Sequence, residues 1–149
     1  EAPDFKLYNT NKEEVTLHPH RDKNVVLLFF PLAFTSTCTA ELCNMRDNLN
    51  VYQNLNAEIF GISVDSPFVL KKFKEELNLP FNLLSDFNRE VSGIYGSQYK
   101  EFILKMQGVS KRSAFVIDKK GTVRYEEILE VSGEQPNYTH IQDCLKQLN

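Results

Sequence analysis

The sequence is poor in the features that mark several large classes of protein. Its three cysteines among 149 residues are too few, and odd in number, for a secreted scaffold built on paired disulfides. No apolar run approaches the roughly 18 residues needed to cross a bilayer, and the longest, residues 25–30, suits a buried strand. A net charge of −3 provides no broad electrostatic attraction for nucleic acid or an anionic membrane. We therefore expect neither as a partner.

Low-complexity tracts, internal repeats and linkers are also missing from the sequence. A chain of 149 residues with 42% hydrophobic and 25% charged residues suits one globular domain, and we expect a single domain over residues 1–149. The few cysteines favour a reducing compartment, for which we expect the cytoplasm. The sequence begins at Glu1 rather than Met, which leaves a removed targeting segment open.

The apolar pattern predicts alternating strands and helices. An N-terminal β-hairpin is expected around the turn "NTNK", followed by a strand buried on both faces in "NVVLLFFP". Further predicted elements are a helix from Thr37, a strand at 58–64, a helix at 65–77, a strand at 81–86, a short helix at 88–96, an antiparallel pair at 113–118 and 122–131, and a last helix at 137–149. This order predicts an α/β fold, with a mixed sheet and helices on both faces.

One cysteine stands where the buried strand gives way to a polar turn and then to a helix. Cys38 follows Pro31 and is surrounded by small hydroxyl side chains at positions 35–37 and 39. Unpaired backbone N–H groups at a helix N-terminus stabilise a sulfur anion, and the thiolate is the reactive form of cysteine. The pattern indicates a reactive Cys38; the alternative is a buried cysteine that packs as a small hydrophobic residue.

A second cysteine, Cys43, follows five residues later on the same predicted helix. Five helical residues give a rise of about 7.5 Å and a rotation of about 140°, so the two Cα atoms lie roughly 8.6 Å apart. A disulfide tolerates at most about 7 Å. Pairing of Cys38 with Cys43 therefore requires the first turns of the helix to unwind. The spacing also differs from a C-x-x-C redox pair, and no second ligand pair suggests a zinc site.

The spacing P-x-x-x-T-x-x-C, formed by Pro31, Thr35 and Cys38, resembles the active-site signature of the peroxiredoxins, the AhpC/TSA superfamily. The segments "APDF", "GISVDS", "LLSD", "VSGIYG" and "RSAFVID" occur in the order expected for that family, over essentially the whole chain. The segment "CTAELCNMRD" is most similar to the bacterioferritin-comigratory-protein type. The resemblance implies a thioredoxin-like fold, with a central mixed β-sheet flanked by helices, and a thiol-dependent peroxidase that reduces hydrogen peroxide and organic hydroperoxides.

The resemblance also implies a role for each site residue. Cys38 would attack the hydroperoxide and become a sulfenic acid. Thr35 would hold the peroxide and the thiolate through its hydroxyl, and Pro31 would shield the site from water. Arg112, just before "SAFVID", would stabilise the thiolate and the charge that develops on oxygen. Neither a metal nor an organic cofactor is expected.

Two routes for resolving the sulfenic acid stay open. Cys43 can form an intramolecular disulfide with Cys38 after local unwinding, or an external thiol can do so while Cys43 only packs on the helix. Glu41, where many proteins of this type have Gln, is also similar to the one-cysteine branch of the alkyl hydroperoxide reductases. The expected reductant is thioredoxin or a glutaredoxin-like protein, and both a monomer and a homodimer fit. A peroxide sensor or chaperone platform is the non-enzymatic alternative.

Three further positions allow two interpretations each. Glu41 either supports the site by orienting Arg112 or is a solvated carboxylate on the helix. Phe34 either lines an apolar mouth for organic hydroperoxides or packs under the loop. His18 and His20 flank a proline without a third ligand nearby, so we expect surface residues rather than a metal site.

Overall fold

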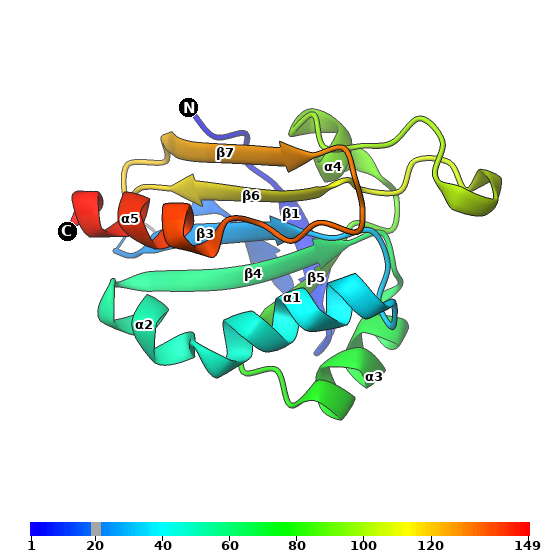
Figure 1. The fold of residues 1–149 in the computed structure, drawn as a ribbon, viewed down its shortest axis with the longest axis horizontal. Helices are drawn as coiled ribbons and strands as arrows, with labels where there is room; N and C mark the ends of the chain where they lie inside the picture. Colours follow the sequence, from blue (N-terminus) through cyan, green and yellow to red (C-terminus); the bar gives the residue numbers. More distant parts are fainter. Residues whose placement is uncertain (19–21) are drawn as a thin grey trace.

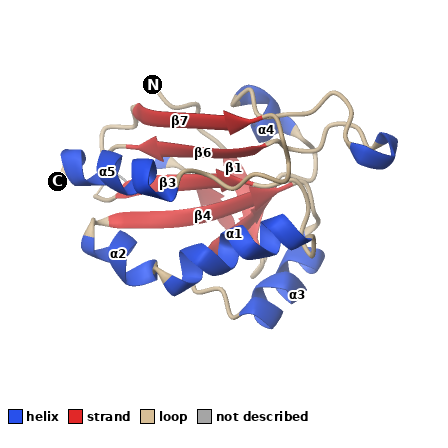
Figure 2. Cartoon of the chain, viewed as in Figure 1, coloured by secondary structure: helices blue, strands red, loops and turns tan. Residues whose placement is uncertain are grey.

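The computed structural model describes residues 1–18 and 22–149, so His20 lies outside the described residues. The elements along the chain are β1 (Lys6–Asn9), β2 (Glu14–Thr16), β3 (Asn24–Phe29), α1 (Ser36–Asp47), α2 (Leu49–Asn54), β4 (Ala57–Ser63), α3 (Pro67–Leu77), β5 (Asn82–Ser85), α4 (Glu90–Ile94), the 3-10 turn η2 (Ile103–Lys105), β6 (Arg112–Ile117), β7 (Val123–Leu129) and α5 (Tyr138–Leu148). Figures 1 and 2 show the strands in one central sheet with helices packed around it.

The sheet is mixed, as the order of elements predicts. Its seven strands lie in the order β2-β1-β5-β4-β3-β6-β7. Strands β3, β4 and β5 are parallel, and β6 and β7 continue the sheet in antiparallel fashion beyond β3. The predicted N-terminal hairpin forms, and its strand β1 also pairs antiparallel with β5. The hairpin is therefore part of the sheet rather than a separate flap.

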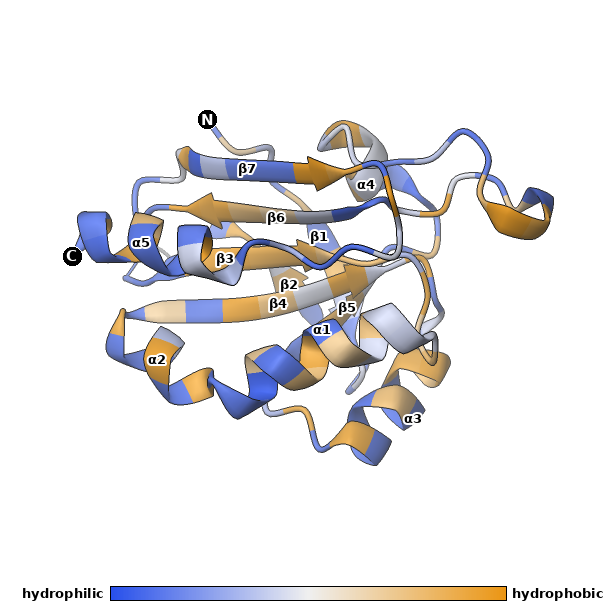
Figure 3. Cartoon of the chain, viewed as in Figure 1, coloured by the Kyte–Doolittle hydropathy of each residue, from blue (hydrophilic) through white to orange (hydrophobic). Residues whose placement is uncertain are grey.

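All six residues of β3 are buried, because both faces of the sheet are covered. Helices α1, α2, α3 and α5 pack on the face that carries Leu28, and α4 with the N-terminal segment packs on the face that carries Leu27. Figure 3 shows the same arrangement as apolar strands between helices with polar outer sides. The sheet thus holds the end of β3, and the loop after it, in a rigid frame.

Two neighbouring polar residues before α3 have separate functions. Ser66 caps α3 by accepting a hydrogen bond from the backbone N–H of Val69 at 3.2 Å. Asp65 instead accepts a bond from the backbone N–H of Ala33 at 2.8 Å, and the hydroxyl of Ser63 donates to the same carboxylate oxygen at 2.6 Å. The carboxylate of Asp65 therefore ties the end of β4 to the loop that leads into α1.

Candidate functional site

Cys38 lies in the first turn of α1, directly after the loop that Asp65 holds. Helix α1 begins at Ser36, and its first backbone hydrogen bond runs from the N–H of Thr39 to the carbonyl of Thr35 at 2.9 Å. The helix leaves the earlier N–H groups, that of Cys38 included, without intrahelical acceptors. The side chain of Cys38 has no exposed surface. The sulfur therefore lies inside the protein, at the positive end of a helix.

Arg112 reaches Cys38 from the neighbouring strand. The antiparallel register of β3 and β6 pairs Phe29 with Ser113, which places Arg112 at the carboxyl end of β3, where the loop to α1 begins. The guanidinium donates from Nη1 to Sγ of Cys38 at 3.3 Å, across 74 residues of sequence. A cysteine that served only as a small hydrophobic residue would have no need of a buried cation. This contact therefore favours the reactive interpretation of Cys38.

Glu41 lies behind this pair and is fully buried. The same Nη1 of Arg112 donates to its Oε1 at 2.7 Å, so Glu41 is not the solvated carboxylate that the sequence left open. Burial raises the pKa of Glu41 to about 7, and the charge of Arg112 lowers it by less. Among the described residues, Oε2 of Glu41 has no hydrogen-bond partner, which makes the carboxylate costly to bury as an anion.

The second amino group of Arg112 anchors another loop. Nη2 donates to the carbonyl of Ser132 at 2.8 Å, in the segment between β7 and α5. The guanidinium thus joins α1, β6 and the segment after β7, and only 1% of the Arg112 surface is exposed. A planar group with several donors in fixed directions can hold three elements at once, and a lysine ammonium cannot reproduce that geometry.

A cavity of about 330 Å³ opens at this site. Its lining residues come from the β3–α1 loop, the start of α1, the segment around η2 and the β7–α5 segment: Pro31, Leu32, Thr35, Ser36, Thr37, Cys38, Phe102, Ile103, Leu104, Met106, Arg112, Ser132 and Gly133. Pro31, Thr35, Cys38 and Arg112 therefore share one cavity. The hydroxyl of Thr35 donates to the carbonyl of Leu32 at 2.7 Å, which leaves its oxygen lone pairs as acceptors.

Cys43 lies farther along the same continuous helix and is partly buried. All three cysteines are free thiols, and Cys43 does not line the cavity that contains Cys38. In an intact helix the spacing still corresponds to about 8.6 Å between the two Cα atoms. Cys144 lies on α5, where it packs against the core.

The apolar wall of the cavity was not predicted from the sequence. Phe102, Ile103, Leu104 and Met106 supply it from the segment around η2, which carried no motif. Phe34 does not line the cavity; its ring contacts Phe73 of α3 with 5.0 Å between centroids. The run "FILKM" contains four apolar residues in a polar stretch, and this was the one signal that could have indicated the wall.

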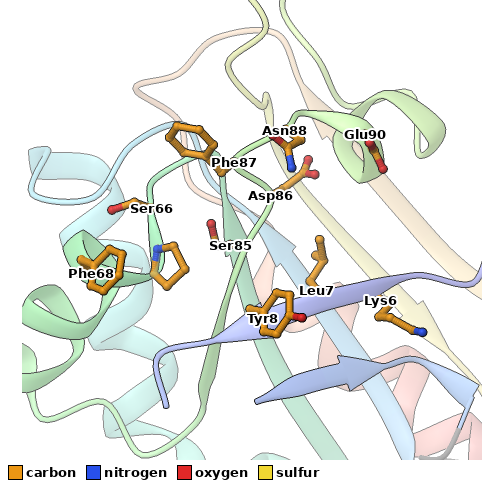
Figure 4. A pocket seen from close by; sticks show the side chains of 11 residues that line it. Lys6, Leu7, Tyr8, Ser66, Phe68, Ser85, Asp86, Phe87, Asn88 and Glu90 are labelled. Atoms are coloured by element: carbon orange, nitrogen blue, oxygen red, sulfur yellow. The ribbon is translucent and has the colours of Figure 1, made fainter. Parts of the chain in front are cut away.

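A second cavity of about 390 Å³ lies beside β1, β5 and the starts of α3 and α4. Figure 4 shows the rings of Tyr8, Phe68 and Phe87 around it, with Asp86 and Glu90 nearby. None of the described residues that line it is a cysteine, histidine or arginine, so it lacks the groups of the first cavity.

Neither a metal site nor a membrane span emerges from the described chain. Within residues 1–18 and 22–149, no three histidine, cysteine or acidic side chains are arranged to hold a metal ion. No helix in the same residues has the length and apolar character to cross a membrane.

Comparison with known proteins identifies the family. The AhpC/TSA family matches residues 1–126. The alkyl hydroperoxide reductase E of Mycobacterium tuberculosis H37Rv is 39% identical over 130 residues, which cover 85% of this chain and 82% of that protein. Peroxiredoxin Bcp of Bacillus subtilis strain 168 is 38% identical over 122 residues, covering 80% and 77% of the two chains.

A solved structure gives the same result for the fold. The crystal structure of peroxidoxin BcpB from Mycobacterium tuberculosis superimposes with a TM-score of 0.83 and 30% identity, covering 99% of this chain and 92% of that chain. The thioredoxin-like fold and the family that the motif predicts are both confirmed. The chain therefore belongs to the AhpC/TSA family and is a peroxiredoxin, a thiol peroxidase with relatives of the bacterioferritin-comigratory-protein type.

Proposed function

We propose that Cys38 is the peroxidatic residue and that this peroxiredoxin reduces both hydrogen peroxide and organic hydroperoxides. The observation that carries the proposal is the 3.3 Å contact between Nη1 of Arg112 and Sγ of Cys38, inside a cavity that Pro31 and Thr35 also line. A guanidinium and free N–H groups at a helix start together stabilise the thiolate and the negative charge that forms on oxygen.

The first step is a nucleophilic displacement on oxygen. The Cys38 thiolate attacks the terminal oxygen of the hydroperoxide, an S–O bond forms and the O–O bond breaks. The electron pair of that bond leaves with the other oxygen, which takes up a proton and departs as water or an alcohol. Sulfur is oxidised to a sulfenic acid and the peroxide is reduced. Thr35 accepts the peroxide hydrogen, and Arg112 donates toward the oxygen on which charge develops.

Cys43 then resolves the sulfenic acid. Its thiolate attacks Sγ of Cys38, an S–S bond forms, and hydroxide leaves and is protonated to water. The first turns of α1 unwind for this step, because an intact helix holds the two Cα atoms beyond the reach of a disulfide. A dithiol protein, thioredoxin or a glutaredoxin-like protein, returns two electrons and two protons and becomes a disulfide itself. Every group used comes from one chain, so a monomer and a homodimer are equally suited.

The test is the intact mass of the reduced protein after one equivalent of hydrogen peroxide, with a sulfenic-acid trap present. We compare the wild type with Cys43→Ser and use Cys144→Ser as the matched control. The proposal predicts a disulfide, about 2 Da lighter, in wild type and Cys144→Ser, and a trapped adduct on Cys38 only in Cys43→Ser. Arg112→Lys should oxidise about a hundredfold more slowly, because it removes a donor that stabilises developing charge.

Two other outcomes would contradict parts of the proposal. A trapped adduct in both the wild type and Cys43→Ser would replace resolution by Cys43 with resolution by an external thiol. No mass change in any variant at stoichiometric peroxide would overturn Cys38 as the peroxidatic residue and favour a sensor or chaperone platform.

A further inference from the structure

Three serine side chains are buried together at the start of β6, and we call them the serine cluster. Ser97, Ser110 and Ser113 each expose no more than 1% of their surface. Oγ of Ser97 lies 2.7 Å from Oγ of Ser113 and 3.4 Å from Oγ of Ser110. Ser97 follows α4, which Figure 1 shows near the start of β6. Buried hydroxyls cost free energy unless they are hydrogen-bonded, so the cluster holds its members in defined positions.

The serine cluster and the guanidinium of Arg112 lie on opposite faces of the sheet. Successive side chains of a strand point to opposite faces, so the side chains of Arg112 and Ser113 diverge. Farther along β6, Ala114 belongs to the same apolar cluster as Cys38, whereas Phe115 belongs to the cluster on the α4 side. The guanidinium therefore approaches the sulfur on one face, while the serine cluster contacts the same strand from the other face.

Ser97 binds both backbone groups of Lys111, the residue directly before Arg112. The N–H of Lys111 donates to the carbonyl of Ser97 at 2.7 Å, and the hydroxyl of Ser97 donates to the carbonyl of Lys111 at 3.1 Å. The hydroxyl of Ser110 lies within donor distance of the same two carbonyls, at 3.0 Å and 2.9 Å. The carbonyl of Lys111 shares a planar peptide unit with the N–H of Arg112. The serine cluster therefore fixes the backbone from which the arginine side chain extends.

Arg112 lies just beyond the ladder that joins β3 to β6. The last residue pair of that ladder is Phe29 with Ser113. On its other side, Arg112 still pairs with Leu129 of β7. Ser97 therefore takes the place of β3 beside the strand at the point where the guanidinium leaves the backbone.

We propose that Ser97 is a positioning residue for peroxide reduction, because it fixes the backbone before Arg112 and so orients the guanidinium toward Sγ of Cys38. This inference rests on the proposed function and adds a residue to it. Ser97 does not line the cavity of Cys38, so it acts through Arg112 and not on the peroxide. A displacement of about 1 Å at a reacting group can lower a rate about a hundredfold, so even a smaller shift of the guanidinium should be measurable.

The experiment measures the second-order rate constant for oxidation of Cys38 by hydrogen peroxide in a single turnover, without reductant. At pH 7 the rate constant of Ser97→Ala should be about tenfold below that of the wild type. It should also reach half its maximum about one pH unit higher, because a displaced guanidinium stabilises the thiolate less. A loss of stability alone would not move this pH profile. Glu41, which also binds the guanidinium, is the same in every protein compared.

A second comparison tests whether Ser97 acts through Arg112. In the background of Arg112→Lys, the further change Ser97→Ala should alter the rate constant by less than about twofold, since the guanidinium that Ser97 orients is already gone. Independent effects would multiply. A further tenfold loss in the double variant would therefore overturn the inference.

The matched control is Ser92→Ala, which removes another fully buried hydroxyl. Ser92 lies on α4, and its hydroxyl accepts a hydrogen bond from Nε2 of Gln98 at 3.1 Å instead of binding the backbone of Lys111. This variant should keep the rate constant and the pH profile of the wild type. An equal loss in Ser92→Ala would reveal a general effect of removing a buried hydroxyl and would overturn the inference.

Ser110→Ala keeps the test decisive if Ser97→Ala does not fold. It removes the second hydroxyl that donates to the carbonyl of Lys111, so the rate constant should fall about threefold and the pH profile should shift in the same direction. A rate constant and pH profile equal to those of the wild type would overturn the inference while leaving the proposed function intact. If hydrogen peroxide oxidised Cys38 in none of the proteins, the wild type included, the proposed function itself would fall.

Discussion

At the scale of single residues, one nitrogen atom has two acceptors. Nη1 of Arg112 donates both to Sγ of Cys38 and to Oε1 of Glu41. Two buried acceptors on one donor compete for the same positive charge. Burial raises the pKa of Glu41 to about 7, so its carboxyl group titrates near neutral pH close to Sγ of Cys38. When Glu41 is neutral, the guanidinium charge has Sγ of Cys38 as its remaining side-chain partner at Nη1.

The raised pKa of Glu41 predicts a contribution to the pH dependence of stability that the substitution Glu41→Gln removes. The pKa of Glu41 is about 7 in the folded protein, above its ordinary value of 4.5, so the folded state binds the proton more tightly. The stabilisation from that proton is complete below pH 4.5 and is lost as pH rises through 7. Relative to Glu41→Gln, the free energy of unfolding of the wild type should fall by on the order of 3 kcal/mol over this range.

Urea unfolding of the reduced proteins at several pH values between about 4 and 8 measures this difference. Glu134→Gln makes the same change of charge on an exposed loop and serves as the control. Parallel stability curves for the wild type and Glu41→Gln would show that the carboxyl group does not titrate in this range.

At the scale of elements, α1 has no side-chain cap at its start, where Arg112 is the group that holds Cys38 and Glu41, and it has a second anchor farther on. No side chain caps its N-terminus, because the hydroxyl of Thr35 donates to Leu32, whereas α3 and α5 each have a side-chain cap. A missing cap costs a helix about 1 kcal/mol. Beyond Cys43, the guanidinium of Arg46 donates to the carbonyl of Leu77 at 2.5 Å and binds α1 to the end of α3. Unwinding should therefore stay within the first turns.

A substitution in those turns should accelerate disulfide formation. Ala40 is exposed within the segment that must unwind, and Ala40→Gly lowers helix stability by about 1 kcal/mol. The Cys38–Cys43 disulfide should then form up to about fivefold faster after oxidation, which rapid alkylation followed by mass measurement can follow. Lys71→Gly makes a comparable exposed substitution in α3 and should leave the rate unchanged. Equal rates for the wild type and Ala40→Gly would argue against unwinding as the limiting step.

At the scale of the whole molecule, one sheet separates two apolar clusters. Leu27 and Leu28 are consecutive in β3 and fully buried, and each belongs to a different cluster. A strand with one solvated face would tolerate truncation of one of the two side chains. In this protein both faces of β3 are packed, so truncation of either leucine side chain removes buried contacts.

We therefore expect Leu27→Ala and Leu28→Ala to be similarly destabilising. Each should lower the free energy of unfolding by about 2–5 kcal/mol, because the surrounding side chains fill only part of the space left behind. Leu104→Ala removes the same atoms from a side chain that is 88% exposed, and its effect should stay within about 0.5 kcal/mol. Urea unfolding compares the three, and a mild effect at either buried leucine would contradict the two-cluster core.

The sequence by itself determined the elements whose signals are local. The run of apolar residues before Pro31 predicts a strand buried on both faces, and β3 is such a strand. The spacing of Pro31, Thr35 and Cys38 indicates a strand, a turn and a helix start, and it identifies the family. Such features depend on residues within a few positions of one another, so periodicity and spacing are enough to predict them.

Only the tertiary structure determined which side chains far apart in the sequence contact one another. Arg112 could be named from its motif, but its contact with Cys38 depends on the antiparallel register of β3 and β6. The burial of Glu41 and the position of Ile103 and Leu104 at the cavity likewise depend on how α1 and the segment around η2 pack. No local pattern encodes these contacts, because strand register and packing arise from the cooperative folding of segments far apart in the chain.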